Sequence, residues 1–139
     1  MPAFTELRVG MTAASSRTVT ETDIVLFAGI TGDMNPVHLD EVAAERSLFG
    51  GRIAHGMLTA GYVSATLGMK LPGPGAIYVE QTLRFTRPVR PGDTVTAAVE
   101  ILEIDAETRR VRLRTTCANQ DGKTVLDGEA VVLIPEETS

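Results

Sequence analysis

The chain has little cysteine, few aromatic residues and a deficit of positive charge. Cys117 is the only cysteine among 139 residues, so no disulfide can form within the chain. Lysine and arginine together number 13 against 18 aspartates and glutamates, which gives a formal net charge of −5. Nucleic-acid-binding modules usually carry a basic footprint. These absences exclude a fold held by intrachain disulfides and argue against nucleic acid as a partner.

The sequence also lacks the marks of export and of membrane insertion. Its first residues contain neither a basic region nor an apolar run, so we expect no secretory signal. With a single cysteine, this favours a cytoplasmic location. Residues 53–69 carry no formal charge apart from one histidine, but they barely reach the roughly 17 residues that a membrane span needs. We expect a buried core helix there and no membrane contact.

This central helix is predicted to be the element around which the chain folds. A helix without a polar face is expected to be buried on every side. Its small residues share one face and permit the close approach of another element; they are Gly56, Ala60, Ser64 and Gly68. Larger apolar side chains on the helix are expected to fill the core: Met57, Leu58, Tyr62 and Met69.

The remaining pattern predicts a single domain over residues 1–139. An edge strand over 12–20 precedes a short helix, which starts at a capping-box pattern at 20–23 and ends near 29–32. Asp40 can cap a second short helix over 41–46. Beyond the Pro-Gly-Pro-Gly break, alternation predicts strands over 77–85, 94–102, 110–119 and 125–134. Sequential hairpins imply an α+β fold, in which an antiparallel meander of about five strands curls around the central helix.

Asp33 and His38 flank an Asn-Pro turn, which can bring their side chains to the same place. A carboxylate beside an imidazole can orient a water molecule and move its proton. The structural alternative is that Asp33 only closes the turn and His38 is a satisfied surface group. The spacing alone leaves both interpretations open.

His55 and Gly56 stand where the central helix begins. The first N–H groups of a helix have no partner within it, and Gly56 lets a ligand approach them without a side chain in the way. A developing oxyanion there would be stabilised by the amide and by the helix dipole. The alternative is that Gly56 only permits close packing and that His55 is an ordinary polar residue at the helix start.

Other polar groups are weaker candidates. Gln81 falls on the inward face of its predicted strand, which it shares with Val79, while Tyr78 falls on the other face. Its buried amide therefore needs a hydrogen-bond partner from a loop or a ligand. The Ser64 hydroxyl is expected to bond back to a carbonyl in the preceding turn. Cys117 is expected to be a small buried hydrophobe. A metal set could be drawn from Asp33, His38, Asp40 and His55, but their spacing matches no known ligand pattern, so we expect no metal.

Three stretches together resemble the MaoC-like (R)-specific enoyl-CoA hydratases. Residues 32–40 read Gly-Asp-Met-Asn-Pro-Val-His-Leu-Asp, residues 53–57 read Ile-Ala-His-Gly-Met, and residues 77–85 read Ile-Tyr-Val-Glu-Gln-Thr-Leu-Arg-Phe. The resemblance runs from about residue 20 to the end of the last predicted strand. It implies a hot-dog fold, in which an antiparallel sheet wraps a central helix, and a homodimer with the active site near the interface.

The resemblance also implies a reaction and a role for each residue. The expected substrate is an acyl-CoA thioester, and the expected activity is that of a hydro-lyase, which adds water reversibly and syn to trans-2-enoyl-CoA without a cofactor. Asp33 and His38 would activate the water, and the Gly56 amide would bind the thioester oxygen. Ser64, near Asp33, would line the substrate pocket with Gln81 and His55. Two alternatives stay open: a hot-dog acyl-CoA thioesterase and a non-catalytic acyl-CoA-binding subunit.

Overall fold

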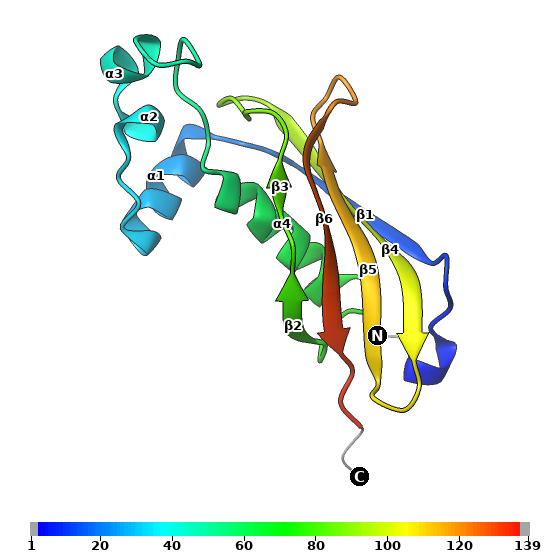
Figure 1. Ribbon diagram of the computed structural model, residues 1–139. Helices are drawn as coiled ribbons and strands as arrows, with labels where there is room; N and C mark the ends of the chain where they lie inside the picture. The colour runs from blue at the N-terminus through cyan, green and yellow to red at the C-terminus, as the bar shows by residue number, and fades with distance from the viewer. Residues whose placement is uncertain (1–2, 137–139) are drawn as a thin grey trace.

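A computed structural model describes residues 3–136 of the chain. An antiparallel sheet curves along one long helix, α4 (Gly56–Met69), as Figure 1 shows. The strand order is β1 (Thr12–Thr18), β4 (Thr94–Asp105), β5 (Arg110–Ala118), β6 (Thr124–Leu133) and β2 (Ile77–Gln81), with the short β3 (Arg84–Phe85) also paired to β6. The expected α+β fold, a hot-dog sheet around a central helix, is confirmed.

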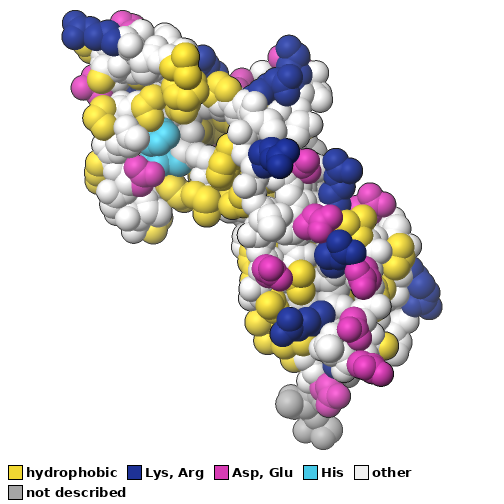
Figure 2. Space-filling view, in the orientation of Figure 1, with side chains coloured by type: hydrophobic (Ala, Val, Ile, Leu, Met, Phe, Trp, Pro, Cys, Tyr) yellow, Lys and Arg dark blue, Asp and Glu magenta, His cyan; other side chains and the backbone are white. Residues whose placement is uncertain are grey.

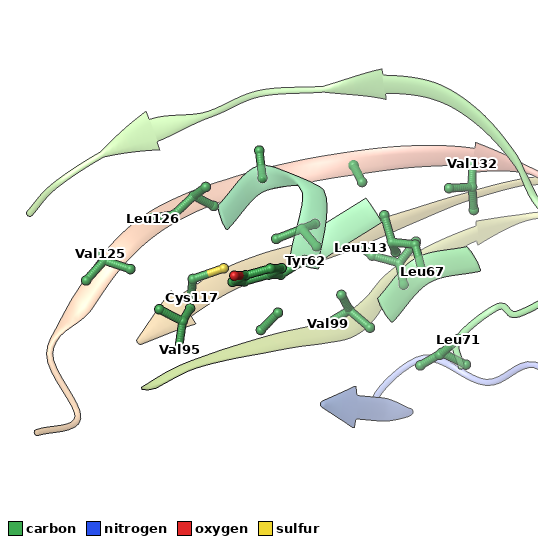
Figure 3. Close-up of a cluster of buried hydrophobic side chains, with 14 of the residues drawn as sticks. Tyr62, Leu67, Leu71, Val95, Val99, Leu113, Cys117, Val125, Leu126 and Val132 are labelled. Atoms are coloured by element: carbon green, nitrogen blue, oxygen red, sulfur yellow. The ribbon is translucent and has the colours of Figure 1, made fainter. Parts of the chain in front are cut away.

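The core lies between α4 and the concave face of the sheet. Side chains of β4 and β5 alternate between buried and exposed as the sequence predicted, because only one face of these strands is apolar. Figure 3 shows Tyr62 and Leu67 of α4 lying against Leu113 and Cys117 of β5. The thiol of Cys117 is fully buried, and burial raises its pKa to about 12, so it is the inert core residue that we expected.

The sheet departs from a simple meander. β4, β5 and β6 follow one another as hairpins, but β2 lies at the edge beside β6, so the last strand is interior. The strand predicted over residues 77–85 is also interrupted. At the break, the carbonyl oxygen of Thr82 lies 1.9 Å from where a Cβ of Gly128 would stand. The backbone at Thr82 approaches β6 so closely that only glycine can stand at position 128.

A β-bulge changes which side chains of β2 share a face. The register against β6 shifts between Tyr78 and Glu80. The Tyr78 hydroxyl consequently reaches the Oε1 atom of Gln81, although strict alternation placed the two residues on opposite faces. The prediction of an unbroken period of two along this strand is therefore wrong.

One side of α4 is left uncovered in the single chain. The helix begins at Gly56, not at residue 53, because residues 53–55 run extended into it. The sheet covers only the side that carries Tyr62 and Leu67, while Met57 and Met69 are 54% and 73% exposed. The expectation that α4 is buried on every side, with both methionines in the core, is wrong for the chain alone. No helix in residues 3–136 is long and apolar enough to cross a membrane.

Three short helices project beyond the sheet at the N-terminal end of α4 (Figure 1). They are α1 (Glu21–Thr31), α2 (Pro36–Leu39) and α3 (Glu41–Glu45). The predicted capping box is confirmed: the N–H of Asp23 donates to Thr20 Oγ1 at 3.1 Å, and the Thr20 N–H donates back to Asp23 at 2.9 Å. Asp40 caps α3, as expected. The single turn η1 (Phe4–Glu6) precedes β1. The segment from α1 to α3 carries the candidate catalytic loop.

Candidate active site

The loop between α1 and α2 is built from short polar turns. The Asp33 N–H donates to Thr31 Oγ1 at 3.1 Å, and Asp33 Oδ1 accepts from the Asn35 N–H at 3.3 Å. Asn35 Oδ1 in turn accepts from the Val37 N–H at 3.2 Å and caps α2. Asp33 does close the turn, as the structural alternative held. Its carboxylate nevertheless stays exposed to solvent and available for a second role.

This loop is tied to the extended residues that lead into α4. The Ile53 N–H donates to the Val37 carbonyl at 3.2 Å, and His38 Nδ1 lies 2.8 Å from the Ile53 carbonyl. His55 Nε2 lies 3.0 Å from the Asp33 carbonyl. A carbonyl can only accept, so each imidazole donates through the nitrogen named. The tautomer of each histidine is thereby set by the backbone.

Asp33, His38 and His55 form one cluster, since one carboxylate oxygen and one ring nitrogen from each histidine all lie within 4.8 Å of one another. The predicted meeting of Asp33 and His38 is confirmed. Because His38 donates through Nδ1, its Nε2 has a free lone pair and can accept a proton. Figure 2 shows histidine atoms at the molecular surface, with hydrophobic side chains nearby. A carboxylate and a basic imidazole nitrogen together can hold and activate one water molecule.

Gly56 is the first residue of α4, next to this cluster. Its N–H cannot be paired within the helix, and the helix dipole adds partial positive charge at this end. A Cβ on Gly56 would lie 2.7 Å from Cε1 of Phe85, so the close-packing alternative also holds. Sequence reasoning missed the contact with Phe85, because nothing local marks a pairing between residues so far apart in the chain.

Ser64 and Gln81 line a separate cavity of about 430 Å³ beside the exposed side of α4. Its other lining residues are mainly apolar: Met57, Ala60, Gly61, Tyr78, Val79, Glu80 and Leu83. Ser64 lies about 12 Å along the helix from Gly56, at about 1.5 Å of rise per residue. The structure of the single chain shows no contact between Ser64 and Asp33.

The two polar residues of the cavity differ in how they are bonded. Gln81 Nε2 donates to Thr115 Oγ1 at 2.9 Å and to the Thr82 carbonyl at 2.8 Å, so its expected protein partner exists. Ser64 forms no back-bond within residues 3–136. Thr59 and Thr66 of the same helix bond to preceding carbonyls instead. The Ser64 hydroxyl is therefore free to meet a ligand.

The cluster fits acid–base chemistry better than metal binding. Each imidazole already uses one ring N–H to donate a hydrogen bond to a carbonyl. The remaining ring nitrogen of His55, Nδ1, is buried in protein. At most two accessible groups remain that could bind a metal ion: Nε2 of His38 and the carboxylate of Asp33. Catalytic zinc sites use three protein ligands. We therefore assign the cluster no metal.

The curved sheet around α4 defines a hot-dog domain, with an Asp–His pair at the N-terminal end of that helix. The family described as the MaoC like domain matches residues 6–122. The chain belongs to the MaoC-like domain family.

Characterised relatives cover nearly the whole chain. It is 52% identical over 134 residues to the 3-hydroxybutyryl-CoA dehydratase of Methylorubrum extorquens, covering 96% of this chain and 85% of that protein. It is 51% identical over 132 residues to the (R)-specific enoyl-CoA hydratase of Rhodospirillum rubrum, covering 95% of this chain and 91% of that protein. The structure of the unliganded R-hydratase PhaJ1 from Pseudomonas aeruginosa superposes with a TM-score of 0.90 at 49% identity, covering 96% of this chain and 86% of that one.

Proposed function

We propose that the chain is an (R)-specific enoyl-CoA hydratase, a hydro-lyase that interconverts trans-2-enoyl-CoA and (R)-3-hydroxyacyl-CoA. The observation that carries this proposal is the Asp33 carboxylate beside a His38 whose Nε2 is left free by the bond from Nδ1 to Ile53. Relatives about half identical in sequence are named for this reaction or its reverse. We place the enzyme in the cytoplasm, because its free cysteine suits a reducing compartment.

In the hydration direction, Asp33 and His38 hold one water molecule between the carboxylate and Nε2. The water oxygen bonds to C3 while the pair accepts a proton, and the electrons of the C2=C3 bond move toward the thioester oxygen. The Gly56 N–H and the dipole of α4 stabilise the charge that develops on that oxygen. The proton then returns to C2 from the same face. Both hydrogens of water are accounted for, and the addition is syn.

The cavity beside α4 suits the acyl chain of such a substrate. It is mostly apolar, and its lining includes Met57, the neighbour of Gly56, as well as Ser64 and Gln81. A thioester carbonyl at the Gly56 N–H would direct an acyl chain along this side of the helix. We assign Ser64 and Gln81 to substrate binding on this basis.

The test is hydration of crotonyl-CoA, followed by the loss of the enoyl-thioester absorbance. Wild type is expected to turn over. Asp33→Asn and His38→Gln are expected to lose about 10²- to 10⁴-fold in kcat while staying folded. The matched control is Asp127→Asn, which changes a half-exposed aspartate on β6 and should leave kcat unchanged. Equal activity in all four proteins would overturn the site assignment.

The same assay separates the two alternatives. A thiol reagent added to the reaction detects free CoA, which a thioesterase releases and a hydratase does not. Binding of crotonyl-CoA without hydration or thiol release would indicate a non-catalytic acyl-CoA-binding subunit. Either result would contradict the hydratase proposal.

We also propose that the enzyme is a homodimer joined along β2. This strand is a free edge of the sheet, and the apolar Ile77 is half exposed on it, next to the uncovered side of α4. Proteins rarely leave an apolar edge strand unpaired. A second copy is the expected occupant because an isologous pairing covers the same apolar surface on both chains. The site would then lie near the interface.

Light scattering after size exclusion tests the dimer. Wild type is expected at twice the chain mass, and Ile77→Lys at the mass of one chain. The control is Ala14→Lys on β1, the opposite edge, which should leave the dimer intact. A monomeric wild type would contradict the proposal.

A further inference from the structure

His55 is the most deeply buried member of the Asp33–His38–His55 cluster. It is 2% exposed, and its Nδ1 atom is buried without a hydrogen-bond partner among residues 3–136. Its ring packs against two others, with its centroid 3.8 Å from that of His38 and 4.7 Å from that of Phe27. A residue enclosed in this way is badly placed to touch a substrate or to exchange a proton with one.

The contacts of His55 point instead to the groups beside it. Its Nε2–H donates to the backbone carbonyl of Asp33 at 3.0 Å, which anchors the main chain of the residue that carries the carboxylate. One face of its ring packs against His38 at a tilt of 30°. It is also the N-cap residue of α4, directly before Gly56. A single side chain thus touches or adjoins every proposed catalytic group.

We propose that His55 is a positioning residue. It fixes the positions of the Asp33 backbone and of the His38 imidazole plane relative to the Gly56 N–H. It neither binds substrate nor transfers a proton. This inference rests on the proposed function, because it assumes that Asp33 and His38 activate the water. It replaces the expected role of His55 in substrate binding.

Two substitutions separate the hydrogen bond from the ring contact. In His55→Gln the amide nitrogen stands the same number of bonds from Cα as Nε2 does, so it can still donate to the Asp33 carbonyl. In His55→Phe the packing against His38 and Phe27 is kept and the donor is lost. The matched control is Thr66→Val, further along the same helix. It removes a buried hydroxyl together with its hydrogen bonds to the Tyr62 carbonyl and to Ser15 of β1.

The inference predicts a specific kinetic pattern with crotonyl-CoA. His55→Phe is expected to lose about 10²-fold in kcat, since small misplacements of catalytic groups cost about that much. Its KM should stay within about twofold, because no substrate contact is removed. His55→Gln is expected to recover to within about tenfold of wild type. Thr66→Val should lower the melting temperature and leave kcat unchanged.

A double-mutant cycle with Asp33→Asn supplies a readout that a purely structural role would not change. If His55 acts through Asp33, the loss from His55→Phe should shrink to less than about threefold in the Asp33→Asn background. Independent losses that multiply would overturn the inference, and so would a raised KM with unchanged kcat. If His55→Phe does not fold, His55→Asn replaces it, because its amide is one bond too short to reach Asp33. Wild type inactive on crotonyl-CoA would refute the proposed function itself, which is a distinct outcome.

Discussion

Replacing Gly56 by alanine tests the proposed oxyanion site at the start of α4. The added Cβ would stand 2.7 Å from Cε1 and 2.8 Å from Cδ1 of Phe85, closer than real Cβ contacts. The ring is 49% exposed, so it can move aside, and the fold should survive. The methyl group would still occupy space beside the Gly56 N–H, where the thioester oxygen has to approach. We therefore expect the loss in catalysis to exceed the loss in stability.

The expected size of the effect follows from the role of a single donor. Loss of one oxyanion-hole hydrogen bond typically lowers kcat by about 10²- to 10³-fold, or about 2.7–4 kcal/mol of transition-state stabilisation. The assay is kcat and KM for crotonyl-CoA hydration, with thermal unfolding measured in parallel. Gly68→Ala is the matched control, because the space around Gly68 is open and it lies near the other end of α4. It should keep full activity.

A double substitution separates a blocked amide from a displaced ring. Gly56→Ala combined with Phe85→Ala removes the atoms that the new methyl group would meet. If displacement of Phe85 caused the loss, the double variant should regain activity relative to Gly56→Ala. We expect no recovery, because the methyl group still covers the amide. Activity of Gly56→Ala within about threefold of wild type would refute the oxyanion reasoning.

Three further predictions concern stability and reactivity. Cys117 should not react with a thiol reagent at pH 8 in the native enzyme and should react fully in denaturant, because burial raises its pKa to about 12; rapid native labelling would contradict its burial. Thr115→Val should lower the free energy of unfolding by about 1 kcal/mol, measured by chemical denaturation, because Gln81 loses a partner at 2.9 Å. The Arg52 guanidinium lowers the pKa of Glu21 below 4.5, so this pair stabilises the fold above that pH and stops doing so as pH falls through the lowered pKa. The stability difference between wild type and Arg52→Gln should therefore shrink under acid, and a difference that is constant with pH would exclude the pair as its cause.

The parts of the fold that local sequence determines were predictable. Thr20 and Asp23 cap α1 through bonds that span three residues, and such bonds leave a readable pattern. The burial alternation of β4 and β5 was visible because one face of each is apolar. The position of β2 beside β6 was not, since it depends on pairing between distant segments.

The candidate site divides in the same way. The Asn-Pro turn between Asp33 and His38 is local, so their meeting could be predicted from spacing. The role of His55 could not, because its partner is the backbone carbonyl of Asp33 and any residue has such a carbonyl. Gln81 was correctly expected to need a partner, but its meeting with Tyr78 depends on a bulge that sequence alternation does not show.

The stereochemistry of hydration in D₂O tests the central claim most directly. In the proposed mechanism the Asp33–His38 pair acts on one water position and lies on one side of the substrate. Crotonyl-CoA should therefore yield 3-hydroxybutyryl-CoA that is (R) at C3, with deuterium at C2 on the same face as the new hydroxyl. NMR of the product and its oxidation by an (R)-specific dehydrogenase report both centres. An (S) or racemic alcohol, anti placement of deuterium, or release of free CoA would contradict the proposed site and mechanism.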